Sequence, residues 1–399
     1  MTVRVLAIGD LANNVTTMKK FVRSKIHLVN FPWNTASKIM DEKDDIEFFD
    51  SINVIDNVNR INKIKNDYDI CLALSPAGAR IAYLCDLNYI ILFVGNDIRT
   101  PPFEKNVKDP YASDSPLAQN FNYFEREFYR TVYMSAVTCV ASYSENYSFL
   151  KKIRKDARRI DLLFVDTKIF DTDTKINNLK NKKFTFFSPQ RIALQKGFDI
   201  ILDALPLCQT DFEILQVKWF ETRNDKEIEF MNHLIKNKPK QIRFIDPMNR
   251  KKLAEEYAKS DAILGQMKAG HLGGIERESA YYKKPIIAFN DVNTDYLVEG
   301  KKVFSPFVPT ENNPQTVAKV IDTITSSKEF REKLSQDEHD FVKQITDPKK
   351  TAEAWDSLFE EFAKSCKTIT RNSSKITIFF RLFSFLFVNK LYLKKIVRK

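Results

Sequence analysis

The stretch of sequence from residue 259 to residue 289 constrains the fold most, because its pattern is typical of a strand, a loop, a helix and a second strand. The apolar run Ala262–Leu264 predicts a short strand, and Pro285 opens a second apolar run, Ile286–Phe289. The loop between them, 265–274, holds four of the nine glycines in the chain. Glycine adopts positive φ angles and lets a ligand approach the backbone closely, so this clustering indicates a binding loop.

A helix is expected after this loop, from Ile275 to about Tyr282, and Glu278 lies in its first turns. The free N–H groups where a helix begins form an anion site. A carboxylate one turn further in accepts charge-assisted hydrogen bonds from a ribose diol, each worth about 1.5–3 kcal/mol. Together the two features predict a nucleoside diphosphate site. The alternative is an ordinary turn of an α/β sheet with a solvated Glu278.

Two cationic residues follow the first strand that is predicted in the second half of the chain. Residues 184–187 predict a strand, Arg191 comes shortly after it, and Lys196 with Gly197 opens a helix, 198–205. Transfer of a group away from a diphosphate develops two negative charges on the leaving group. Two cations and helix-start amides stabilise such charges without a metal ion. The alternative is that Arg191 and Lys196 are ordinary surface residues.

Strands alternate with helical patterns along the whole chain, which predicts the α/β class with doubly wound parallel sheets. A length of 399 residues suits two domains with a core each. The predicted parts are an N-terminal Rossmann-like domain, a polar linker, a C-terminal Rossmann-like domain, an amphipathic helix, and a basic aromatic tail. Their bounds are 1–167, 168–183, 184–350, 351–366 and 367–399.

The spacing in the glycine loop resembles the donor-site motif of glycosyltransferase family 4, also called glycosyl transferases group 1, which has the GT-B fold. In that motif a Glu is followed by seven residues, a second Glu, and a short helix ending in Gly-Lys-Pro-Val-Ile. Glu278 matches the second Glu, the first falls at Gly270, and Lys283 stands where the family usually has Gly. The spacing of Gln266, Gly270, Gly273 and Glu278 is similar to a subgroup in which Gly replaces the first Glu.

The resemblance implies two Rossmann-like domains facing a cleft, an acceptor domain at 1–167 and a nucleotide-sugar donor domain at 184–350, with the helix at 351–366 crossing back to the first. It also implies a retaining glycosyltransferase that moves a sugar from a nucleotide diphosphate sugar to a glycan or lipid-linked acceptor. It implies that Arg191 and Lys196 hold the donor diphosphate and act in catalysis. The same resemblance assigns the ribose to Glu278. The alternative function is a catalytically inactive GT-B protein that binds a nucleotide or a glycan. The full set of expected donor-binding residues is Gly270, His271, Gly273, Gly274, Ile275 and Glu278.

Two further loops are predicted at strand ends in the first half of the chain, at Ser75–Gly78 and at 95–102. The second resembles a Gly-Ser-Asp-Ile-Arg loop of the acceptor-facing domain in family 4 relatives. Asn96, Asp97 and Arg99 are therefore expected to bind the acceptor. The alternative is a proline-terminated turn with an internal Asp97–Arg99 pair.

Metal ions and cofactors are not expected. Asp171-Thr172-Asp173 has the form of a metal-binding motif, but it follows a segment that resembles the interdomain segment of the family. The five cysteines are an odd number without a Cys-x-x-Cys pair, which is typical of buried thiols in a cytoplasmic protein. Most of the net charge of +11 lies in the tail, because residues 367–399 contain nine Lys or Arg and no acid. A nucleic-acid face on the globular body is therefore not supported.

The tail also contains the apolar run Ile376–Val388, which is shorter than a membrane span and has Arg381 inside it. Aromatic residues beside cations are typical of a helix that lies on an anionic membrane surface. The predicted location is therefore cytoplasmic, peripheral at the inner face of the membrane. The alternative is a helix that docks on the surface of the protein itself.

Overall fold

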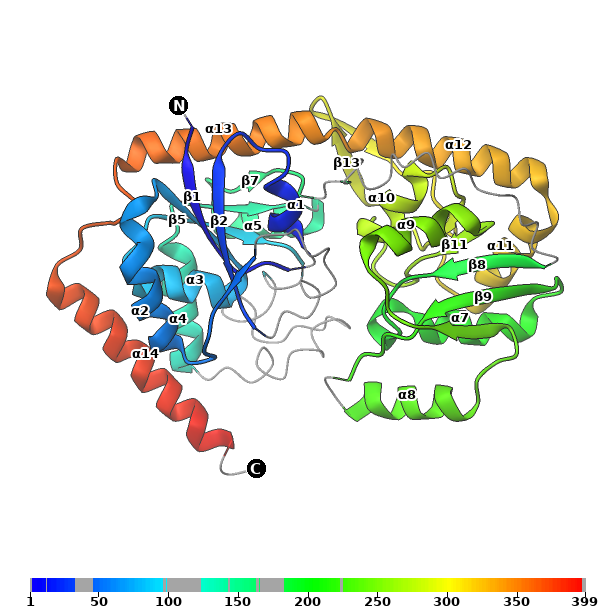
Figure 1. The fold of residues 1–399 in the computed structure, drawn as a ribbon, viewed down its shortest axis with the longest axis horizontal. Helices are drawn as coiled ribbons and strands as arrows, with labels where there is room; N and C mark the ends of the chain where they lie inside the picture. The colour runs from blue at the N-terminus through cyan, green and yellow to red at the C-terminus, as the bar shows by residue number, and fades with distance from the viewer. Residues whose placement is uncertain are drawn as a thin grey trace. The chain divides into compact units, whose positions relative to one another are not determined.

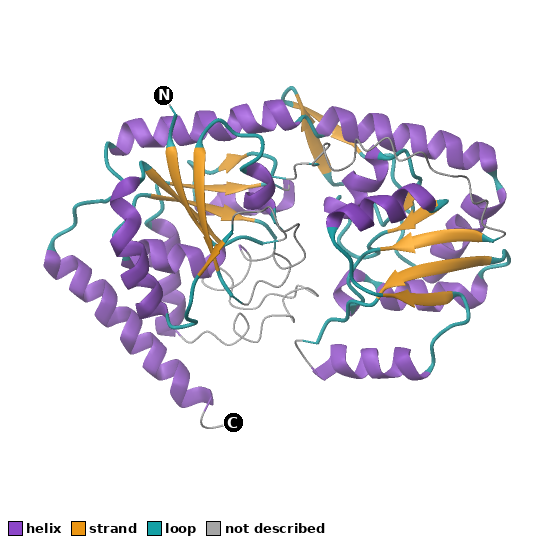
Figure 2. Ribbon diagram, viewed as in Figure 1, coloured by secondary structure: helices purple, strands orange, loops and turns teal. Residues whose placement is uncertain are grey.

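The computed structural model describes residues 2–11, 13–32, 46–95, 98, 123–142, 144–162, 165, 183–222 and 225–396. The chain divides into two compact units. The first combines Met1–Lys38, Glu42–Leu162 and Pro348–Lys399, and the second is Leu163–Asp347. Each unit is built on a parallel sheet covered by helices, which confirms the predicted fold class (Figures 1 and 2). The linker predicted at 168–183 lies outside the described residues except for Lys183.

The described part of the first unit forms a seven-stranded parallel sheet in the order β3-β2-β1-β4-β5-β6-β7. The strand order reverses between β1 and β4, so successive strands are added on both sides of β1. The strands are β1 (Arg4–Ile8), β2 (Lys25–Asn30), β3 (Glu47–Phe48), β4 (Ile70–Leu74), β5 (Tyr89–Phe93), β6 (Thr138–Ala141) and β7 (Arg158–Arg159). The helices are α1 (Asn14–Met18), α2 (Val54–Ile64), η2 (Lys65–Asp67), α3 (Ser75–Leu84), α4 (Tyr123–Met134), α5 (Ser144–Ile153), α13 (Pro348–Cys366) and α14 (Lys375–Ile396).

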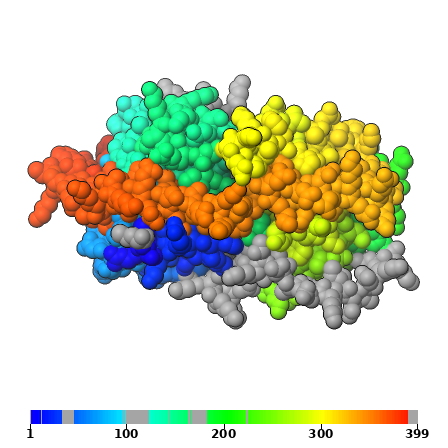
Figure 3. All heavy atoms as spheres, turned by 90° about the horizontal axis from the view of Figure 1, so that it is seen from above, coloured from blue at the N-terminus to red at the C-terminus, as the bar shows by residue number. Residues whose placement is uncertain are grey.

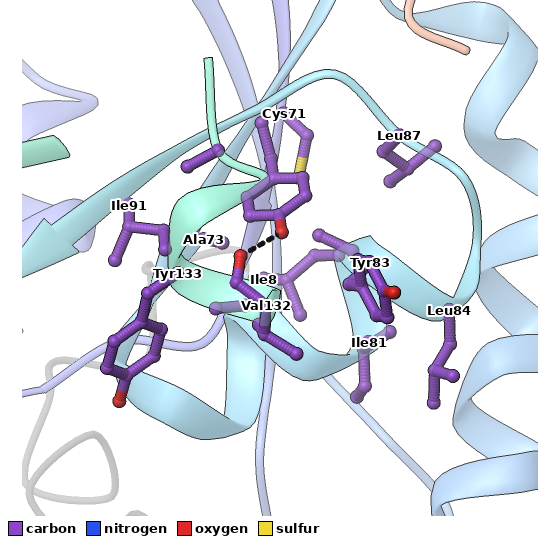
Figure 4. Packing of buried hydrophobic residues seen from close by; sticks show 14 of the residues in the cluster. Ile8, Cys71, Ala73, Ile81, Tyr83, Leu84, Leu87, Ile91, Val132 and Tyr133 are labelled. Carbon is purple, nitrogen blue, oxygen red and sulfur yellow. Dashed lines mark hydrogen bonds between the residues drawn. The ribbon is translucent and has the colours of Figure 1, made fainter. Parts of the chain in front are cut away.

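Central strands of this sheet are apolar on both faces because helices cover both sides. All five residues of β4 and of β5 are buried. Side chains of β1, β4 and β5 meet those of α3 and α4 in one continuous core (Figure 4). The buried Tyr89 hydroxyl donates to the Val132 carbonyl within that core, so the hydroxyl group has a hydrogen-bond partner.

Ser75–Gly78 is not the loop that the sequence predicts, because these residues form the first turn of α3. Pro76 stands where a helix tolerates proline, near the N-terminal end. Gly78 allows α3 to lie directly against β1, since a Cβ at this position would approach the Ile8 carbonyl oxygen to 2.3 Å. The glycine therefore serves helix–sheet packing.

Replacing Gly78 by alanine is expected to lower the free energy of unfolding by about 1–3 kcal/mol or more, because α3 must move off β1 to make room. Denaturant unfolding measures the loss. Gly95→Ala is the matched control, since a Cβ there meets nothing within 4 Å. Equal stability of Gly78→Ala and the wild type would show that α3 is not held this closely.

Helix α13 packs on the first unit through a buried aromatic and a buried acid. Trp355 is fully buried and its indole N–H donates to the Asp161 carbonyl at 2.9 Å. Asp356 accepts hydrogen bonds from the backbone N–H groups of Arg23 and Ser24, both at 2.9 Å. In the space-filling view α13 (orange) runs between the blue segment near Ser24 and the green segment near Arg158 (Figure 3).

The described part of the second unit holds a five-stranded parallel sheet, β10-β9-β8-β11-β12, and an antiparallel hairpin. The strands are β8 (Phe184–Ser188), β9 (Phe212–Val217), β10 (Ile242–Ile245), β11 (Ala262–Leu264) and β12 (Ile286–Ile287), with β13 (Asp295–Val298) and β14 (Lys301–Phe304) in the hairpin. The helices are η5 (Leu194–Lys196), α7 (Phe198–Ala204), η6 (Leu205–Leu207), α8 (Asp225–Lys236), α9 (Arg250–Lys259), α10 (Gly274–Tyr281), α11 (Pro314–Ser326) and α12 (Lys328–Ile345).

Candidate donor site

The candidate site lies where the strand order of the second sheet reverses, between β8 and β11. In open parallel sheets ligands bind beyond the carboxyl ends of the strands at such a point. The connections that follow the two adjacent strands run in opposite directions there and leave a crevice between them. The segment with Arg191 and Lys196 follows β8, and the glycine loop 265–274 follows β11. The two motifs singled out from the sequence therefore stand on the two sides of one switch point.

Arg191 is positioned by a buried acid. Its Nη1 lies 2.8 Å from a carboxylate oxygen of Glu221, and only 4% of the Glu221 side chain is exposed. Next to Arg191, the side-chain amide of Gln190 donates to the Gly265 carbonyl at 2.5 Å. The segment after β8 is thus tied both to the acid and to the start of the glycine loop.

Lys196 and Gly197 lie directly against the glycine loop. The Met267 N–H donates to the Lys196 carbonyl at 2.8 Å. Gly197 has a φ of +73°, and a Cβ there would come within 2.8 Å of the Met267 Cβ. Glycine is needed here for both reasons, the left-handed backbone and the close contact. The structure therefore brings together two segments that are separated by about 70 residues in the sequence.

Polar side chains hold the glycine loop in shape from within. The Gln266 side-chain oxygen accepts from the N–H groups of Lys268 and Ala269, the former at 3.0 Å. The Gln266 side-chain amide donates to the carbonyl of His271 at 3.2 Å. Glu276 is 3% exposed, and its carboxylate accepts from the Gly273 N–H at 2.8 Å, closing the start of α10.

Glu278 lies one turn into α10, with 14% of its side chain exposed. One of its oxygens is 3.0 Å from Nη2 of Arg250 at the start of α9, and the other accepts from the Tyr257 hydroxyl at 3.3 Å. Burial, followed by the charge of Glu278, raises the pKa of Tyr257 well above its usual value. The hydroxyl therefore stays protonated and donates to a carboxylate that is held in one orientation.

The remaining expected donor residues line the same turn. Gly274 is the exposed first residue of α10, and Ile275 behind it packs on the core of the unit. His271 and Gly273 precede them and are partly exposed.

Comparisons with known proteins give a family match and similar folds. Residues 169–340 match the family described as glycosyl transferases group 1. The fold is similar to that of HepE from Anabaena in complex with UDP and glucose, with 14% identity, a TM-score of 0.66, and coverage of 90% of this chain and 100% of the other. It is also similar to sucrose-phosphate synthase from Thermosynechococcus elongatus, with 12% identity, a TM-score of 0.65, and coverage of 91% and 100%.

A third similar structure is a glycosyltransferase from Rickettsia africae ESF-5, with 17% identity, a TM-score of 0.60, and coverage of 93% of this chain and 100% of the other. No curated protein matches the chain. Residues 169–340 are thus a glycosyl transferases group 1 domain, and the chain has the GT-B fold.

The glycosyltransferase motif departs from the family pattern at Gly270, and the structure gives the physical reason. Gly270 has a φ of +67°, and a Cβ at this position would lie 2.7 Å from the Cβ of Asp291 and 3.1 Å from the ring of Phe289. The Asp291 N–H also donates to the Gly270 carbonyl at 3.0 Å. The loop after β12 therefore occupies the space into which a glutamate at position 270 would extend.

Sequence reasoning missed several charged residues of the site. Lys268 donates to the Leu194 carbonyl at 2.7 Å and to the Asp199 carboxylate at 3.1 Å, so it joins the two segments a second time. Glu221 and Arg250, which pair with Arg191 and Glu278, were also missed. Lys268 could have been found from its place inside the glycine loop. The other two carry no local signal, because their partners lie about 30 residues away.

Asn96, Asp97 and Arg99, which are expected from the sequence to bind the acceptor, lie outside the described residues, as do Asp171 and Asp173. Within the ranges that the structure describes, no three His, Cys, Asp or Glu side chains are grouped so that they could hold a metal ion.

Proposed function

We propose that the switch point of the second unit binds a nucleotide diphosphate sugar and that the enzyme transfers the sugar, with retention of anomeric configuration, to a glycan or a lipid-linked acceptor. The contact between Met267 and Lys196 supports this proposal most directly. It joins the segment that carries Arg191 and Lys196 to the glycine loop that leads into α10. Two cations and helix-start amides are the combination that a leaving diphosphate requires.

Each group has a distinct part in the proposed reaction. The bond between the anomeric carbon and the diphosphate oxygen breaks, while the acceptor oxygen forms its bond on the same face of the sugar. The leaving phosphate oxygen takes the proton of the acceptor. Lys196 and Arg191 stabilise the negative charge that develops on the diphosphate, and Glu278 accepts hydrogen bonds from the ribose. Gly270, His271, Gly273, Gly274 and Ile275 bring backbone groups close to the donor.

A panel of nucleotide sugars tests the proposal. A specific donor stabilises the folded state by mass action, so its presence should raise the melting temperature, whereas nucleotide sugars that do not bind should leave it unchanged. UDP-sugars come first, because the structurally similar HepE was solved with UDP and glucose. NMR of the product made from an α-linked donor should then show an α-linkage. An inverted product contradicts retention, and binding without any sugar transfer contradicts the proposed reaction.

Replacing Glu278 by glutamine is expected to cost about 1.5–3 kcal/mol of nucleotide affinity, because the ribose hydroxyls then lose a charged acceptor. Calorimetric titration with the nucleoside diphosphate that the panel identifies measures the loss. Glu256→Gln is the matched control, since Glu256 pairs with Lys259 on the neighbouring helix α9.

A ligand without the diol separates a direct contact from an effect on the fold. Glu278→Gln and wild type should bind the 2′,3′-dideoxy nucleotide equally well if Glu278 contacts the ribose. If Glu278→Gln lowers the affinity for the dideoxy ligand, relative to wild type, as much as it lowers the affinity for the normal ligand, Glu278 acts only through Arg250 and Tyr257.

The proposal extends to location at the inner face of a membrane, held peripherally by the C-terminal tail. In the described parts of the chain, no helix combines the length and the apolarity that a membrane span needs.

A further inference from the structure

Helix α14 packs on the first unit along one of its faces. Phe385 and Val388 are 4% and 7% exposed and belong to the core of that unit. The ring centroids of Phe385 and of Phe128 in α4 lie 6.0 Å apart. The Arg80 guanidinium of α3 lies 5.5 Å from the centroid of the Phe385 ring. The tail therefore docks on the protein surface, as one of the two sequence-based alternatives expects, and Figure 1 shows it beside α3 and α4.

A polar cluster around Asp86 fixes the orientation of the docked helix. One oxygen of Asp86 lies 2.6 Å from Nη1 of Arg381, and the carboxylate also accepts from the backbone N–H of Ser373 at 2.9 Å. The Arg381 guanidinium lies 4.7 Å from the ring centroid of Tyr83. Just before the helix, Arg371 donates to the Leu87 carbonyl at 2.7 Å. These contacts prevent α14 from rotating about its own axis, so its other face is always presented outward.

That outward face is apolar as well. Its large apolar residues are between 44% and 69% exposed. Phe124 of α4 extends the same surface, because its exposed ring contacts Phe387 edge to face at 5.5 Å. A helix that is apolar on all sides is normally covered on all sides. The outer face, as defined here, consists of Ile376, Phe379, Phe380, Phe383, Leu386 and Phe387.

We propose that this outer face docks on a membrane that carries anionic lipids. The charge of the chain argues for this occupant, since residues 367–399 contain nine Lys or Arg and no acid. Five of these cations follow Val388, directly after the apolar run. Exposed aromatic side chains enter the boundary between headgroups and acyl chains, while neighbouring cations attract anionic headgroups. The docked helix would thus carry the membrane-binding face on the first unit; this inference rests on the peripheral location proposed above and not on the sugar-transfer reaction.

Vesicle co-sedimentation of the full-length protein tests the proposal. Wild type is expected to bind vesicles of phosphatidylcholine mixed with phosphatidylglycerol, and to bind less when salt is added, because salt screens the cations. The triple variant Phe379→Ser, Phe380→Ser, Phe383→Ser should bind about 100-fold more weakly, since three aromatic rings no longer enter the lipid. Its melting temperature and its stabilisation by the sugar donor should stay unchanged.

A matched triple variant replaces exposed apolar residues elsewhere by serine, namely Ile52, Ile228 and Val292. It should bind vesicles like the wild type. Equal binding by the Phe379, Phe380, Phe383 variant and the wild type would overturn the proposal. Absence of vesicle binding by the wild type would also overturn the proposal. If the wild type is then found to be a dimer and the Phe379, Phe380, Phe383 variant a monomer, the outer face binds a second copy of the chain.

Discussion

Replacing Lys196 by alanine is expected to lower kcat/KM by about 100- to 1,000-fold, because a charge that stabilises the leaving diphosphate is lost. Release of nucleoside diphosphate from the donor measures this effect without knowledge of the acceptor. The fold should be preserved, since the bond that joins this segment to the glycine loop comes from the Lys196 backbone carbonyl. Arg191→Ala should cause a similar loss of activity.

The two variants are expected to differ in stability. Arg191→Ala leaves the carboxylate of Glu221 buried without the guanidinium 2.8 Å away, so its melting temperature should fall. Lys183→Ala is the control for a lost cation on the same segment, because Lys183 precedes β8 and pairs with Asp211 at 2.6 Å. It should change neither activity nor stability appreciably. Unchanged kcat/KM in both Lys196→Ala and Arg191→Ala would refute the donor-site proposal.

Introducing the glutamate of the family motif at position 270 is expected to destabilise the protein. A side chain there adopts a φ of +67° and meets the Cβ of Asp291 at 2.7 Å. The unfavourable backbone costs about 1–2 kcal/mol and the overpacking about 1–3 kcal/mol, so unfolding in denaturant should show a loss of about 2–5 kcal/mol. Donor turnover should fall, because the glycine loop must shift away from Asp291 and Phe289 and so changes its position relative to the segment around Lys196.

Gly300→Ala separates the two costs of Gly270→Glu. Gly300 has a φ of +78°, but a Cβ there meets nothing within 4 Å, so only the backbone cost should appear. If Gly270→Glu is as stable as the wild type and more active, the loop has room for the acid. The explanation that Asp291 leaves no room for a side chain at position 270 would then be wrong.

Local patterns in the sequence predicted much of the fold. The apolar run at residues 262–264 corresponds to β11, and the run that Pro285 opens contains β12. Each is a short run of buried residues, because a strand that is buried on both faces of its sheet consists of consecutive apolar residues. Two of the two-residue strands, β3 and β7, show no such pattern. Ser75–Gly78 was predicted as a loop, because proline and glycine mark turns more often than the start of a helix.

The candidate site was predictable in its parts, since a glycine cluster, a carboxylate one turn into a helix and a nearby Arg–Lys pair are local features. The same holds for the tail, whose apolar run and nine cations are visible in the sequence alone. The sequence thus determined which residue types are available for a donor site and for a membrane-facing helix. It did so because residue spacing decides what one strand, loop or helix can present.

Only the tertiary structure decided which of these parts meet. Strand order places the Lys196 carbonyl against the Met267 N–H, and the loop after β12 leaves no room for a side chain at Gly270. The pairing of Asp86 with Arg381 joins residues 295 positions apart and decides which face of α14 is covered. Contacts at such separations depend on how sheets and helices pack, and the spacing within any one segment carries no information about them.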